Sequence, residues 1–113
     1  MQLTTAEAGP SAVCLIVSGR LDTPGVDEIE PRFTQAARGS GKHVLVDLHE
    51  VSFVSSMGVR MLISTARALH AAQRRMVLFA PQPLVREMLD TVALDQIIPV
   101  ATDQTAALGL LEG

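Results

Sequence analysis

Short runs of apolar residues alternate along this chain with segments whose apolar residues recur at helical spacing, and this alternation limits the possible folds most. The first run, AVCLIVSG (12–19), is apolar on both faces and stops at Gly19, which is typical of a strand covered on both sides. HVLVDLH (43–49) follows the turn signal GSGK, and RMVLFAP (75–81) ends at a proline. QIIPV predicts a weaker edge strand, because Pro99 cannot donate to a sheet, and MQLTTAEA predicts a short first strand.

The segments between these runs have the periodicity of amphipathic helices. In residues 23–39 the apolar residues recur every three or four positions, and Pro31 predicts that this helix starts late or bends. Residues 58–73 form the clearest helix, with a stripe made by Val59, Leu62, Ile63, Ala66 and Leu69. Residues 83–90 open with a proline at the first helical position, and residues 102–113 predict a last helix.

The order of these elements predicts the fold class. We expect one domain over residues 1–113, an α/β fold in which a small mixed sheet of four or five strands packs against about four helices.

Composition argues against several classes of partner and location. The net charge is −3, the nine Lys and Arg residues are scattered, and only three residues are aromatic, so a nucleic-acid surface is not expected. Cys14 lies inside an apolar run and is predicted to be a core residue. No apolar run approaches the ~20 residues that span a bilayer. The first basic residue is Arg20, so the basic N-terminal region typical of a signal peptide is not expected. We therefore expect a cytoplasmic monomer that does not bind membranes.

Two hydroxyls and a glycine stand where the strand around 43–54 gives way to the next helix, in VSFVSSMGVRMLI (51–63). A helix N-terminus carries unpaired N–H groups and a partial positive charge, and the carboxyl end of a strand is where α/β proteins meet ligands. Ser55 and Ser56 are therefore a helix cap, a nucleophile, an anion cradle or a phosphorylation site. The spacing alone favours the cap. A nucleophile is disfavoured because G-x-S-x-G is absent.

No other cluster predicts a cofactor or metal site. His43 and His49 are about 20 Å apart on one extended strand, which is too far to share a metal ion. The glycine-lysine loop of nucleotide-binding proteins and G-x-G-x-x-G are both absent. We expect neither a cofactor nor a metal.

The segment VLVDLHEVSFVSSMGVRMLISTARAL (44–69) resembles the signature of STAS domains, in particular of bacterial anti-sigma-factor antagonists. That signature is a strand ending in Asp-Leu, a short apolar stretch, and (Asp/Ser)-Ser-x-Gly-(Leu/Val) opening a helix. GRLDTPGVDEI (19–29) resembles the Gly-x-Leu-Asp turn of the family. PQPLVREMLDTVALDQIIPV (81–100) resembles its Pro-x-Val-(Arg/Lys) helix. The resemblance covers nearly the whole chain.

The resemblance implies a STAS-like fold and a binding module, not an enzyme. In that family the serine before x-Gly is phosphorylated by a serine kinase of the GHKL type, which is also the anti-sigma factor. The unphosphorylated form binds this kinase and releases the sigma factor, and a metal-dependent serine phosphatase resets the switch. Carried over, the phosphorylated residue is Ser56.

The resemblance also implies which residues contact the partner: Asp22, Ser55, Ser56, Met57, Gly58 and Arg60. Asp22 either contacts the partner or caps the following helix. Ser55 replaces the aspartate of the best-known antagonists, as in many relatives with Ser-Ser-Ala-Gly-Leu-Arg, and this leaves open whether Ser55 is also modified. The alternative within the family is a docking subunit of a lipid-transport ABC system or of a signalling scaffold, without phosphorylation.

Overall fold

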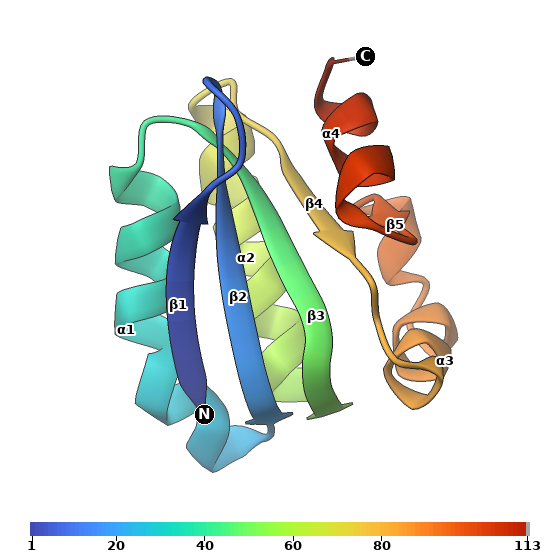
Figure 1. Ribbon diagram of the computed structural model, residues 1–113. Helices are drawn as coiled ribbons and strands as arrows, with labels where there is room; N and C mark the ends of the chain where they lie inside the picture. Colours follow the sequence, from blue (N-terminus) through green and yellow to red (C-terminus); the bar gives the residue numbers. More distant parts are fainter. Residues whose placement is uncertain (113) are drawn as a thin grey trace.

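A five-stranded sheet in the order β1–β2–β3–β4–β5 runs through the molecule (Figure 1). The structure is a computed structural model that describes residues 1–112. Its strands are β1 (Gln2–Glu7), β2 (Ala12–Leu21), β3 (His43–Val54), β4 (Met76–Phe79) and β5 (Val100–Ala101). β1 is antiparallel to β2 and the other pairs are parallel, so the sheet is mixed, as the sequence predicts.

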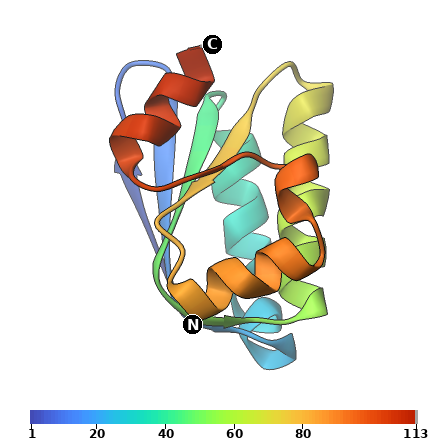
Figure 2. The same cartoon turned by 90° about the vertical axis from the view of Figure 1, so that its right-hand side faces the viewer.

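Four helices and one 3₁₀ turn cover this sheet. They are α1 (Thr23–Gly39), α2 (Ser56–Ala71), α3 (Pro83–Thr91), the turn Leu94–Gln96, and α4 (Gln104–Glu112). α1 and α2 lie side by side on one face, whereas α4 packs on β3, β4 and β5 from the other (Figures 1 and 2). Within residues 1–112, no helix has both the length and the apolar composition required to cross a membrane.

Two hydrophobic clusters fill the two faces of the sheet, because alternate residues of each strand point to opposite sides. Leu15, Val46 and Leu78 belong to the larger cluster beneath α1, α2 and α3. Cys14 and Phe79 belong to the smaller cluster beneath α4. Burial, with a smaller contribution from the charge of Asp47, raises the pKa of the Cys14 thiol to about 11. Cys14 is therefore a protonated core residue, as predicted.

Several predicted boundaries are wrong, and the first two are at Gly19 and Pro31. β2 does not stop at Gly19 but continues to Leu21 through a register irregularity, and Gly19 has a φ of +110°. α1 does not start late: it begins at Thr23 and includes Pro31. Pro31 is exposed, and the opposite face of α1 is anchored in the core by buried Ile29 and Phe33. Tertiary packing therefore keeps the helix continuous across a residue that lacks an N–H.

The predicted stripe of α2 is partly wrong as well. Leu62 and Leu69 are buried as expected, but Met61 and Thr65 complete the buried face. The other three members of the predicted stripe are only half-buried: Val59, Ile63 and Ala66. α2 also begins two residues before Gly58, which is buried within its first turn.

Candidate functional site

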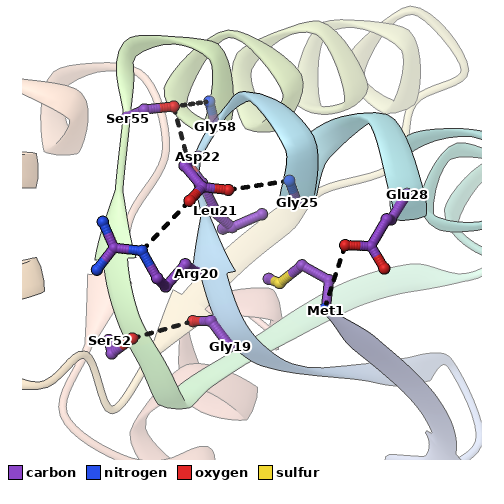
Figure 3. Close-up of polar contacts among 10 residues, drawn as sticks. All are labelled: Met1, Gly19, Arg20, Leu21, Asp22, Gly25, Glu28, Ser52, Ser55 and Gly58. Carbon is purple, nitrogen blue, oxygen red and sulfur yellow. Dashed lines mark hydrogen bonds and ion pairs between the residues drawn. The ribbon is translucent and has the colours of Figure 1, made fainter.

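The ends of β2 and β3 lie side by side, and each is followed directly by the N-terminus of a helix. Leu21 at the end of β2 pairs with Val54 at the end of β3. The Leu21 carbonyl oxygen accepts two hydrogen bonds from Ser55, from the backbone N–H at 2.8 Å and from the hydroxyl at 2.9 Å (Figure 3). Through these hydrogen bonds α1 and α2 begin next to each other, at the carboxyl ends of β2 and β3.

Ser55 caps α2. Its Oγ accepts a hydrogen bond from the Gly58 N–H at 3.3 Å, and its hydroxyl donates a hydrogen bond to the Leu21 carbonyl oxygen. Ser56 is the first residue of the helix and its side chain is exposed. Among the residues that the structure describes, no hydrogen-bond partner is found for the Ser56 hydroxyl. The two adjacent serines therefore have different environments: one hydroxyl is bound within the fold and the other is accessible.

Asp22 caps α1 with the same spacing. Its Oδ1 accepts from the Gly25 N–H at 2.9 Å, and its Oδ2 lies 3.2 Å from Nε of Arg20 (Figure 3). The Gly25 N–H, followed by Arg20, holds the pKa of the Asp22 carboxyl below its usual value. The capping alternative for Asp22 is thus confirmed. A contact between Asp22 and a partner stays a prediction.

Each cap is followed three residues later by a glycine that packs against β2. A Cβ on Gly58 would lie 2.8 Å from the Leu21 carbonyl oxygen, 3.0 Å from the Leu21 Cβ and 3.1 Å from a methyl group of Val54. A Cβ on Gly25 would overlap the carbonyl oxygen of Arg20. Both glycines are buried, so the close approach that they permit is between the helix start and the chain's own β2.

The other predicted contact residues follow the exposed side of α2. Arg60 is exposed one turn after Ser56, and Met57 is half-buried against the larger core cluster. A shallow groove runs along this side and is lined by Ser56, Val59, Arg60, Ile63, Ser64 and Arg67. The groove combines half-buried aliphatic side chains with two guanidinium groups.

Two features of this edge are absent from the expectations based on sequence. The guanidinium carbon of Arg20 lies 4.4 Å from the centroid of the Phe53 ring, a cation–π contact between paired residues of β2 and β3. No sequence signal predicts it, because the pairing depends on the strand register. Gly25 is also absent from the predicted set, although its spacing from Asp22 repeats that of Gly58 from Ser55.

Two of the three histidines, His43 and His49, are held in separate local contacts. Nδ1 of His43 accepts from the backbone N–H of Arg75 at 3.0 Å. Nδ1 of His49 lies 2.7 Å from Oδ1 of Asp47, and this hydrogen bond raises the pKa of His49. Among residues 1–112, no three His, Cys, Asp or Glu side chains are placed to hold a metal ion.

The different environments of the two serines predict different effects on stability. We expect Ser55→Ala to lower the free energy of unfolding by about 1 kcal/mol, because it removes the cap of α2. Ser56→Ala should change it by less than about 0.5 kcal/mol, as for other exposed positions. Urea denaturation of both variants measures the difference. Equal losses would show that the Ser56 hydroxyl contributes to the fold.

A model of the STAS domain family matches residues 4–107 of this chain. The chain is 27% identical over 99 residues to BtrV of Bordetella bronchiseptica, covering 88% of this chain and 84% of BtrV. It is also 27% identical over 95 residues to the anti-sigma F factor antagonist of Lysinibacillus sphaericus, covering 83% of this chain and 81% of that protein.

The fold is similar to that of solved STAS proteins. The unphosphorylated form of the anti-sigma factor antagonist SpoIIAA superposes with a TM-score of 0.75 at 24% identity, covering 93% of this chain and 92% of SpoIIAA. The phosphorylated form of SpoIIAA from Bacillus gives 0.67 at 23% identity, covering 93% and 96%. These likenesses confirm the predicted fold.

Proposed function

Because this chain belongs to the STAS domain family, we propose that it is a cytoplasmic anti-sigma-factor antagonist switched by phosphorylation of Ser56. In its unphosphorylated form it binds an anti-sigma factor that is also a serine kinase, and the sigma factor is released. A metal-dependent serine phosphatase removes the phosphate. The names of the relatives from Lysinibacillus and of SpoIIAA support this proposal. The protein acts as a binding module and not as an enzyme.

The observation that carries the proposal is the accessibility of the Ser56 hydroxyl beside a serine that already caps the helix. A kinase requires a hydroxyl that reaches its active site without unfolding the substrate. Ser55 donates its hydroxyl proton to Leu21 and accepts from Gly58, whereas Ser56 is exposed at the first position of α2. Phosphorylation of Ser56 therefore leaves the cap in place.

The start of α2 accommodates the charge that a phosphate adds. Phosphorylation adds about −1.5 to −2 charges, and a helix N-terminus stabilises anions through its free N–H groups and dipole. Arg60 follows Ser56 by four residues, the spacing at which side chains on a helix meet, so it can pair with the phosphate. The folded monomer thus tolerates the modification.

The bound complex responds differently. The groove along α2 offers Val59 and Ile63 for apolar contact and Arg60 and Arg67 for charged contact. In the proposed interface Asp22, Ser55 and Met57 adjoin the Ser56 end of this groove, and buried Gly58 lies within the first turn beneath it. A phosphate at Ser56 must lose its hydration when a partner covers this surface, and it faces the nucleotide phosphates of a kinase. Desolvation and like-charge repulsion then oppose docking.

Phosphate transfer tests the site directly. Incubation with the cognate kinase and ATP should add one phosphate, measured by intact mass, and Ser56→Ala should abolish it. Ser64→Ala, exposed on the same helix, is the matched control and should still be phosphorylated. Phosphate on the Ser56→Ala protein would assign the site to another residue, with Ser55 the first to examine. Tight binding without any phosphate transfer would favour a docking subunit.

A further inference from the structure

A cavity of about 440 Å³ lies at the opposite end of α2 from Ser56, between α2, the start of β4, the segment before β5, and α4. Figure 2 shows these elements around the upper half of the sheet. β5 is two residues long and pairs only with Leu78 and Phe79, so the first two residues of β4 have no strand beyond them. The cavity opens beside these two residues of β4, where no further strand pairs with them.

One part of the wall is apolar: Ala66, Met76, Val77, Ile97, Pro99 and Leu110. Ile97 is 50% exposed and Leu110 is 45% exposed. Burying such large aliphatic side chains against a ligand would be favourable, because it removes apolar surface from water. Two of the most exposed large hydrophobic residues of the described chain therefore lie at one cavity. This arrangement offers an apolar body a place to bind.

The remaining wall is basic: Arg67, His70, Arg74 and Arg75. Among the side chains that the structure describes, no Asp or Glu lines the cavity, although the chain as a whole carries a net charge of −3. The local charge at this cavity is therefore positive, whereas the net charge of the whole chain is negative.

The arginines are not equally free. Arg74 donates to the carbonyl oxygens of Ala37, Arg38 and Lys42 and thereby ties α2 to the end of α1. Arg75 donates through one Nη to the Leu110 carbonyl oxygen at 3.3 Å. No ion pair involves Arg67 within the described residues. Arg67 therefore has its guanidinium group available for an anion, and Arg75 retains further N–H groups.

We propose that this cavity binds a medium-chain fatty carboxylate, with the carboxylate at Arg67 and Arg75 and the alkyl chain against the apolar wall. The volume lies in the range of small-molecule sites. A guanidinium group pairs with a carboxylate through two parallel hydrogen bonds. A nucleotide fits less well, because the lining contains no aromatic side chain on which a base could stack.

This cavity shares Arg67 with the far end of the groove along α2, but it lies away from Ser56 itself. Arg67 follows Ser56 by eleven residues, which is about 16 Å along a helix, so the carboxylate and a phosphate on Ser56 do not compete for the same groups. The proposal does not depend on the identity of the kinase. Its failure would leave the proposed switch intact.

Calorimetric titration of the full chain with decanoate, below its micelle concentration, tests the proposal. We expect saturable binding of one decanoate, and binding of decanol at least about tenfold weaker, which corresponds to ~1.4 kcal/mol. Arg67→Gln should weaken decanoate binding about tenfold or more. Ala66→Met, which fills the cavity from α2, should abolish it with little change in Tm. The control Arg32→Gln, on exposed α1 surface away from the cavity, should bind normally.

Three results would overturn the proposal. The first is the absence of saturable decanoate binding. The second is decanol binding as tight as that of decanoate, since the basic wall would then contribute nothing. The third is decanoate binding that neither Arg67→Gln nor Ala66→Met weakens, since the ligand would then occupy another surface.

Discussion

We expect phosphorylation of Ser56 to weaken binding to the anti-sigma factor by about 100- to 1000-fold. A like-charge clash at a docked interface costs several kcal/mol, and each 1.4 kcal/mol corresponds to a factor of ten in affinity. Over the same step the Tm of the free protein should change by no more than about 2 °C, because the Ser56 side chain is exposed and the helix cap belongs to Ser55. Calorimetry and thermal unfolding of both forms measure the two quantities.

The control for this experiment is a negative charge placed at the opposite ends of the strands, where β2 begins. Ser11 is exposed just before β2 begins, so Ser11→Asp adds a negative charge away from the start of α2 and should leave the affinity nearly unchanged. Ser56→Asp should weaken binding less than phosphate does, because it adds only one charge. Equal affinities of the phosphorylated and unphosphorylated proteins would disprove the switch. A large fall in Tm would show that Ser56 supports the fold.

The largest effects on stability should come from the two glycines that follow the caps. We expect Gly25→Ala to lower the free energy of unfolding by about 3 kcal/mol and Gly58→Ala by about 2 kcal/mol, the range for overpacking a core. The added methyl group meets backbone in both cases, the Arg20 carbonyl oxygen or the Leu21 carbonyl oxygen. Neither oxygen can turn away as a flexible side chain would, so the start of the helix must move from β2.

Gly109→Ala is the matched control for these two variants. Gly109 lies inside α4 with no atom within 4 Å of the position of an added Cβ, so alanine should be neutral or stabilise the protein by up to about 1 kcal/mol. Urea denaturation of the three variants measures the effects. If Gly58→Ala unfolded like the wild type but failed to bind the anti-sigma factor, Gly58 would belong to the interface and not to the internal packing.

Features that depend on a few neighbouring residues are the ones that the sequence predicts well. The strand and helix order is read from apolar periodicity, and it agrees with the observed elements. A weak edge strand is predicted around Pro99, which lacks an N–H, and β5 is a two-residue edge strand, although it shares only Val100 with the predicted segment QIIPV. The capping hydroxyl at the start of α2 is likewise a local signal, and it is realised by Ser55.

The tertiary structure decides which residues of these local elements contact one another. The register of β2 against β3 brings the two helix starts together, so that Leu21 binds Ser55 and Arg20 meets Phe53. It also determines which serine is bound within the fold and which is exposed. The strand end predicted at Gly19 and the late helix start predicted from Pro31 are both wrong, because packing against the rest of the molecule outweighed their local preferences, whereas the alternative of a bend at Pro31 stays a prediction. Hydrogen bonds between distant segments depend on register and packing, and no short stretch of sequence carries that information.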